Sequence, residues 1–233
     1  LVMLTHFFKK GNTLHLQFSK EIFRLFGRIT VNGFSSFIID VAMGVLTMLF
    51  NRQIMKYLGT DALAVYGVIV SVSTLVQCCS YGIGQASQPI ISQNYGAGNV
   101  GRIKKMLRYN IITAAIFGAV WAAITFAVPN GLIRLFMTPT ASVLAIAPAI
   151  IRIYGSSFLL LPFNVYSTYY FQATMRAKTS MFVSVARGIL ISGALILIIP
   201  VTFGADMIWW AMPVTELVVA VFAGAMMAKK IQL

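Results

Sequence analysis

The stretch Val31–Leu58 is an apolar run of helix length that contains a single carboxylate, Asp40. A bilayer core about 30 Å thick requires about 20 apolar residues in a helix, and Val31–Phe50 supplies them. Asp40 then lies about 15 Å deep, near the midplane, where a carboxylate costs at least about 2.5–3.5 kcal/mol on insertion scales. An acid retained at such a cost indicates function, and we predict that Asp40 titrates or binds a cation.

The composition places the whole chain in a membrane. Its 233 residues are 59% hydrophobic and 10% charged, and its mean hydropathy is +0.85, outside the range of a soluble domain. Apolar runs of about 20 residues favour helices over a barrel, whose strands alternate over about ten residues. We therefore predict an all-α integral membrane protein, a bundle of six transmembrane helices. The predicted spans are Val31–Phe50, Leu63–Ile91, Asn110–Val128, Ser142–Thr174, Thr179–Pro200 and Met207–Ala228.

Turn-forming residues separate these spans. We expect a polar turn at Asn51–Asp61, a glycine-rich turn at Asn94–Gly101 and a helix break at Pro129–Gly131. Pro148 and Pro162 lie inside the fourth span, so that span is expected to tilt or kink.

The placement of the 18 Lys and Arg residues predicts the orientation. We interpret residues 1–30 as a cytoplasmic connector, and because the chain opens with Leu1 we expect it to be part of something longer. The outer side then receives Arg52, Lys56 and Arg134, while Arg152 and Arg187 lie inside spans. The other 13 are on the inner side: Lys9, Lys10, Lys20, Arg24, Arg28, Arg102, Lys104, Lys105, Arg108, Arg176, Lys178, Lys229 and Lys230. This pattern predicts a multi-pass protein of the cell membrane with both termini cytoplasmic, and it accounts for the net charge of +13 without nucleic acid.

The residue types used in catalysis and metal binding show no suitable arrangement. His6 and His15 have no Cys or acid cluster beside them, so we expect no metal site. Cys78 and Cys79 are adjacent in an apolar run and are predicted to be packing residues. The glycine-rich turn lacks the Lys-Ser ending of a phosphate loop. We expect no enzymatic activity and no cofactor.

Two ionisable residues besides Asp40 fall near mid-depth. From the helical rise, Glu216 lies about 15 Å below the outer end of its span, and Arg187 lies about 12 Å above the inner end of its own. We predict that Arg187 and Glu216 form a buried ion pair that fixes packing, with Asp40 as another partner for Arg187. The alternative is that Glu216 titrates during function.

Other polar side chains inside the spans predict a roomy cavity for amphipathic cations or drugs. Asn32 and Ser36 precede Asp40 at helical spacing, and Gln77, Gln85 and Gln88 suit either close helix packing or a polar lumen. For any single tyrosine, packing in the core is the competing interpretation. The predicted cavity-lining residues are Asn32, Ser36, Tyr81, Gln85, Asn164, Tyr166 and Tyr170.

Several motifs, in order, resemble the C-terminal lobe of the multidrug and toxic compound extrusion (MATE) family. The run YGIGQASQPIISQNYGAGNVGRIKKMLR, Tyr81–Arg108, resembles that lobe's second helix and following loop. The Asp40 helix, FIIDVAMGVLTMLFN, is similar to the family's seventh helix, where many members have an acid at this place. FQATMRAKTSMF, the span with Arg187, and PVTE at Pro213–Glu216 resemble the tenth to twelfth helices.

The resemblance implies a twelve-helix, cation-coupled antiporter that expels drugs against proton or sodium entry. Residues 31–233 would form the six-helix C-terminal lobe, with a six-helix N-terminal lobe as its partner. Asp40 would be the cation-coupling residue. Two alternatives remain open: a flippase of lipid-linked oligosaccharides with related architecture, or a non-transporting half-gene product. The flippase is expected to line its cleft with more cations than Arg152 and Arg187 provide.

Overall fold

The computed structural model describes residue 26, residue 41 and residues 44–228. Residues 39–233 group into one unit of contacts, and the fold is described for that unit alone. The predicted connector lies outside the described residues except for Phe26, and Asn32, Ser36 and Asp40 lie outside them as well.

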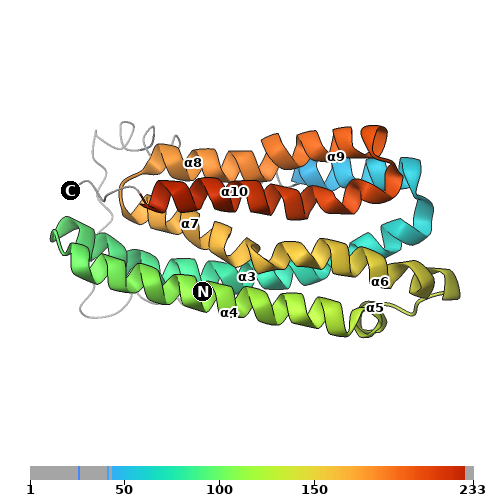
Figure 1. The fold of residues 1–233 in the computed structure, drawn as a ribbon, viewed down its shortest axis with the longest axis horizontal. Coiled ribbons are helices and arrows are strands. Elements are labelled where there is room, and N and C mark those ends of the chain that lie inside the picture. Colours follow the sequence, from blue (N-terminus) through green and yellow to red (C-terminus); the bar gives the residue numbers. More distant parts are fainter. Residues whose placement is uncertain (1–25, 27–40, 42–43, 229–233) are drawn as a thin grey trace. The chain divides into compact units, whose positions relative to one another are not determined.

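The described part of this unit is built from helices joined by short turns (Figure 1). A 3₁₀ segment, η1 (Ser156–Leu159), links α6 to α7, a π-helical segment, η2 (Ala186–Leu190), links α8 to α9, and a second 3₁₀ segment, η3 (Ala205–Trp210), precedes α10. Residues 44–57 are helical, and they are followed by α3 (Gly59–Gly96), α4 (Val100–Ala127), α5 (Pro129–Phe136), α6 (Ala141–Gly155), α7 (Leu161–Ala173), α8 (Ala177–Val185), α9 (Ile191–Thr202) and α10 (Ala211–Ala228).

Five stretches of the described chain are long and apolar enough to cross a membrane. They are Gly59–Gly96, Val100–Ala127, Ala141–Ala173, Ala177–Thr202 and Ala205–Ala228. These match the second to sixth predicted spans, and the described helical residues 44–57 belong to the first. The predicted all-α membrane bundle is confirmed.

Three predicted turns differ from the structure. The expected polar turn at Asn51–Asp61 is wrong, because the helix continues through residue 57 and turns at Leu58–Gly59. Phe50 and Ile54 are fully buried one turn apart, so core packing extends the helix past its polar neighbours. Gly59 has φ +83°, a conformation open mainly to glycine.

The other two differences follow from packing and from proline. α4 begins at Val100, ten residues before the predicted start, because Ile103 is fully buried and anchors the additional turns. The predicted break at Pro129–Gly131 starts a helix instead, since Pro129 occupies the first turn of α5, where its missing N–H has no cost.

The fourth span bends at η1, between the two prolines, where α4 approaches it closely. A Cβ on Gly118 of α4 would lie 2.6 Å from the carbonyl oxygen of Leu159, so a glycine is needed there. Gly155, at the end of α6, packs in the same way against the side chain of Thr125 on α4. Helix contact through small residues is typical of membrane bundles.

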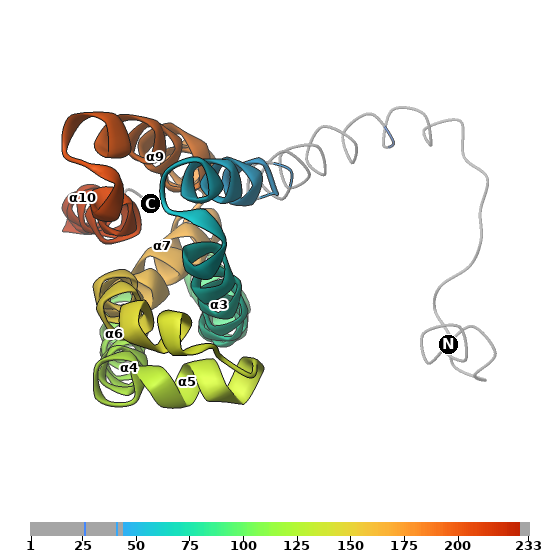
Figure 2. The ribbon, with the colours of Figure 1, turned by 90° about the vertical axis from the view of Figure 1, so that its right-hand side faces the viewer.

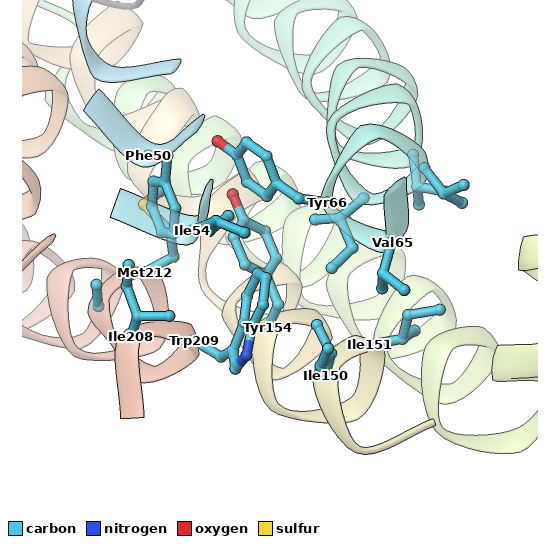
Figure 3. Packing of buried hydrophobic residues seen from close by; sticks show 14 of the residues in the cluster. Phe50, Ile54, Val65, Tyr66, Ile150, Ile151, Tyr154, Ile208, Trp209 and Met212 are labelled. Atoms are coloured by element: carbon cyan, nitrogen blue, oxygen red, sulfur yellow. The ribbon is translucent and has the colours of Figure 1, made fainter. Parts of the chain in front are cut away.

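Two groups of buried apolar side chains hold the helices together. In the first, Phe50 stacks on Tyr66 with ring centroids 4.8 Å apart, and Trp209 of η3 lies 6.3 Å from Tyr66 (Figure 3). The second group, which includes Phe171, joins α3, α4, α7, α8 and α10. Seen end-on, α7 lies between α9–α10 on one side and α3, α4 and α6 on the other (Figure 2).

More than half of the described basic residues belong to elements at one end of the unit. The α3–α4 turn and the α7–α8 junction lie at the same end in Figure 1, and Arg102–Arg108 and Lys178 belong to these elements. Arg52, Lys56 and Arg134 belong to elements at the opposite end. Which end faces the cytoplasm stays a prediction.

Candidate functional site

A cleft of about 300 Å³ lies between helical residues 44–57, α3, α6 and the start of α10. Its walls combine aliphatic side chains with hydroxyl, amide and phenol groups. The described lining includes no charged residue. The polar and aromatic lining residues are Thr47, Phe50, Tyr66, Ser73, Thr74, Gln77 and Tyr154.

The spacing of these residues in α3 explains why they share the cleft. Tyr66, Val70, Ser73 and Gln77 follow one another at intervals of three or four residues, which places them on one face of the helix. Tyr154, from α6, completes the wall, and its ring lies 6.4 Å from that of Tyr66. The cleft therefore depends on α3 and α6 packing through their aromatic residues.

Towards the basic end of α3 the polar face continues as a row shared with α7, here called the α3–α7 polar strip. Gln77 Nε2 donates to the Tyr81 hydroxyl at 2.9 Å, and Gln85 Nε2 donates to the Tyr169 hydroxyl at 3.4 Å. Gln88 Nε2 donates to Gln172 Oε1 at 3.3 Å. The strip comprises Gln77, Tyr81, Gln85, Gln88, Tyr169 and Gln172, each at least partly exposed.

The exposed amides of the α3–α7 polar strip limit which surroundings this face can have in a membrane. Lipid tails offer them no hydrogen bond, so each polar group left in lipid costs free energy. The strip and the cleft are therefore suited to face water or another protein segment rather than acyl chains. Together they form the candidate site.

A second polar centre is buried between α7, η2 and α10. Arg187 Nε donates to Glu216 Oε1 at 2.7 Å, and Asn164 Nδ2 donates to Glu216 Oε2 at 2.6 Å. The same amide also donates to the Glu216 backbone carbonyl at 2.8 Å. Glu216 is 0% exposed and the Arg187 side chain is 14% exposed. Both carboxylate oxygens have a donor, which is the condition for a charged pair in a dry interior.

The π-helical segment η2 contains Arg187. A π-bulge adds a residue to one turn and often occurs where a side chain must be directed to a particular partner. Here the partner is the Glu216 carboxylate on α10, so the ion pair made by Arg187 of η2 connects the fifth span to the sixth.

The structure distributes the sequence-predicted residues over these two centres. Tyr81 and Gln85 lie in the polar strip, whereas Asn164 lies in the buried network beside Arg187 and Glu216. Asp40, Asn32 and Ser36 lie outside the described residues, so their roles stay predictions. The strip also contains Gln77 and Gln88, whose amides the sequence suggested for close packing or a polar lumen, and Tyr169 and Gln172 of α7.

Tyr166 and Tyr170 require a correction. They are 0% and 1% exposed and pack with Ile91, Ile103 and Phe171 in the second core group, so they do not line the cleft. α7 is packed against α3, α4, α8 and α10, and little of its surface is left open. For these two tyrosines, burial favours the interpretation as core residues over the interpretation as cavity-lining residues.

Within residues 44–228 no three His, Cys, Asp or Glu side chains gather in a group able to hold a metal ion. Cys78 and Cys79 are exposed free thiols on α3. The chemistry available at the candidate site is therefore hydrogen bonding and aromatic contact.

Comparison with known proteins relates this fold to transporters. The MatE family matches residues 34–200. The multidrug export protein MepA of Staphylococcus haemolyticus is 24% identical over 225 residues, which cover 96% of this chain and 49% of MepA. The probable multidrug resistance protein YoeA of Bacillus subtilis is 27% identical over 171 residues, covering 73% and 35%.

A solved structure, the outward-facing conformation of a multidrug resistance MATE family transporter, superposes with a TM-score of 0.79 at 18% identity. The alignment covers 92% of this chain and 48% of the transporter. The chain thus spans about half the length of MepA and of this structure. With the family matching well over half of its residues, the chain belongs to the MatE family.

Proposed function

We propose that this chain is the C-terminal lobe of a cation-coupled multidrug antiporter that exports amphipathic drugs across the cytoplasmic membrane. Membership of the MatE family supports the transport class, and the names of the MepA and YoeA relatives support multidrug export. The observation that carries the proposal is the cleft of about 300 Å³ that continues into the α3–α7 polar strip.

The lining of the cleft suits organic cations of varied shape. Tyr66 and Tyr154 are 4% and 7% exposed, so a substrate would meet only the edges of these phenols together with the aliphatic side chains beside them. Hydroxyl and amide groups at Ser73, Thr74 and Gln77 accept or donate hydrogen bonds without demanding one geometry. Because no described lining residue is cationic, the cleft does not repel such a substrate.

The same lining disfavours the flippase alternative. A lipid-linked pyrophosphate is an anion that requires Lys or Arg contacts. Arg187 is already paired with Glu216, and Arg152 Nε donates to the carbonyl of Phe126, away from the cleft. Multidrug export is therefore the better-supported function.

Asp40 is the proposed site of coupling to proton or sodium entry. It precedes Gly44 and Thr47 by four and seven residues, the spacing of one helical face, and both of those residues line the cleft. An acid on that face would exchange its proton or cation close to the bound drug. Its charge state would then favour or oppose binding of a cationic substrate.

An ethidium-efflux experiment tests this proposal. Asp40→Asn, expressed with the complete transporter sequence that contains this chain, is expected to reach the membrane normally and to abolish ethidium export driven by a proton or sodium gradient. Asp206→Asn removes an exposed acid from η3 and serves as the matched control with export retained.

Unchanged export by the Asp40 variant would remove that residue from the mechanism. Size measurement in a mild detergent adds an independent test of the lobe assignment. A six-helix lobe needs a second lobe, or a second copy, to enclose a transport path. A strictly monomeric chain that also transports would contradict the assignment.

A further inference from the structure

Of the five described spans, α4 has the smallest share of buried residues. In its most apolar window 17% of the residues are buried, against 39–44% in the others. Its buried residues, Ile103, Ala114, Gly118 and Thr125, all lie on the side that meets the other helices. α4 lies at the margin of the unit in both views (Figures 1 and 2).

The outward face of α4 has a basic part and an apolar part in one continuous row. Intervals of three or four residues place the members on one side of the helix. Tyr109 is 53% exposed and Ile116 is 61% exposed, so the row is open along its length. The row, here called the α4 stripe, consists of Arg102, Lys105, Tyr109, Ile112, Ile116 and Val120.

The positive charge at the start of the stripe has no counterion among the residues that the structure describes. Lys104 and Arg108 flank the stripe, and both are exposed. The sequence contains no Asp or Glu between Asp61 and Asp206. No ion pair joins these four cations to an acidic residue of the described chain. An external anion is therefore the natural partner of the basic part.

The dimensions of the stripe match one leaflet of a bilayer. From Tyr109 to Val120 the helix rises about 16 Å, close to half of a hydrocarbon core about 30 Å thick. Lys105 Nζ lies over the Tyr109 ring, 5.8 Å from its centroid. Tyrosine is enriched at the boundary between hydrocarbon and headgroups. Arg102 and Lys105 then fall about 6–10 Å beyond that boundary, at the depth of the phosphates.

We propose that the α4 stripe is a binding site for an anionic membrane phospholipid. Arg102 and Lys105 hold the phosphodiester, and the acyl chains lie along Ile112, Ile116 and Val120. Free phosphate would use only the basic part, whereas a lipid uses the whole row. A second copy of this face is disfavoured, because pairing would bring two sets of four cations together.

Lipid titration followed by native mass spectrometry tests the site. The full chain in mild detergent is titrated with phosphatidylglycerol, with phosphatidylcholine of the same acyl chains, and with inorganic phosphate. We expect selective retention of phosphatidylglycerol. Arg102→Gln with Lys105→Gln is expected to weaken that binding about 30-fold, since each cation near an anionic surface contributes about fivefold.

Two further variants distinguish binding at the α4 stripe from attraction of the lipid by the overall positive charge of the protein. Lys56→Gln with Arg134→Gln removes the same charge from exposed residues at the opposite end, and Lys56 also lies over a tyrosine ring, 4.7 Å from the Tyr57 centroid. This control is expected to retain lipid binding. Arg102→Lys with Lys105→Arg preserves both charges and is expected to retain it as well.

Several results would overturn the proposal. They are equal weakening in the opposite-end control, equal retention of phosphatidylcholine, and displacement of the lipid by inorganic phosphate at equal concentration. Dimerisation through this face in lipid-free detergent would also overturn it. Thermal unfolding of each variant shows that a loss of binding does not come from loss of fold.

Discussion

Two polar regions share helix α7, and they differ in what surrounds them. The Arg187–Glu216–Asn164 network is buried, and both oxygens of its carboxylate accept a hydrogen bond. The α3–α7 polar strip is uncharged, at least partly exposed along its length, and joined by longer bonds of 2.9–3.4 Å. Short charged contacts inside and long neutral contacts outside point to different roles.

The difference shows how burial distinguishes a packing role from a binding role among membrane-spanning helices. A buried charge must keep its partner at all times, because losing the partner leaves an unsolvated ion. An exposed amide can exchange its partner for water or for a substrate at little cost. The buried network is therefore suited to hold helices together, and the strip is suited to bind.

The largest expected loss of stability comes from removing Arg187, the cation of the buried network. Arg187→Met leaves the fully buried Glu216 without its counterion, and we expect a loss of about 3–5 kcal/mol in the free energy of unfolding. Glu216→Gln is expected to cost less, because Arg187 is 14% exposed and can reach water. Thermal unfolding and folded yield in detergent measure both.

The double variant and a matched control sharpen this test. Arg187→Met with Glu216→Gln removes both charges and keeps an acceptor for Asn164, so it should lose less stability than Arg187→Met alone. Lys178→Met removes an exposed charge at the start of the same span and should change stability by no more than about 0.5 kcal/mol. Normal folding with lost export would instead assign Glu216 to the transport mechanism.

The sequence predicted those features that depend on distance along a helix. The rise per residue is fixed, so Arg187 and Glu216 could be placed at similar depth before any contact was known. The order of the five described spans followed from apolar runs of sufficient length. In both cases local geometry is enough.

Features that depend on how helices face each other could not be predicted. The tyrosines of α7 lie on one side of the helix, and polar and apolar residues are mixed around it, so its sequence does not tell which tyrosines face the core. Tyr166 and Tyr170 proved buried. The bend at η1 follows from the approach of Gly118 to the Leu159 carbonyl, a contact between distant segments. The π-bulge at Arg187 likewise accompanies a contact with Glu216, on a segment distant in the sequence.

The next largest loss of stability is expected where α3 packs closely against Tyr169 of the strip. A Cβ on Gly84 of α3 would overlap the ring of Tyr169, which belongs to the polar strip. Gly84→Ala therefore forces the two helices or the ring to move, at a cost of about 1–3 kcal/mol in unfolding free energy. Export of ethidium should fall together with stability, because the strip is displaced.

Gly82→Ala is the matched control for that substitution. Gly82 lies two residues earlier on α3, and a Cβ there meets nothing within 4 Å. Replacing a helical glycine without a clash is expected to stabilise by about 0.5–1 kcal/mol. If both variants lose stability equally, the close contact of Gly84 with Tyr169 does not hold the helices.

The smallest effect on stability is expected within the strip itself. Gln88→Leu removes the bond to Gln172, but both partners are partly open, so the unfolding free energy should fall by no more than about 1 kcal/mol. Export should nevertheless change severalfold, because the variant replaces a polar wall with an apolar one. Thr113→Val removes a hydroxyl from exposed α4 and should leave both quantities unchanged. A strip variant that loses stability without changing export would mean that the strip is a packing surface, and the contrast with the buried network would then disappear.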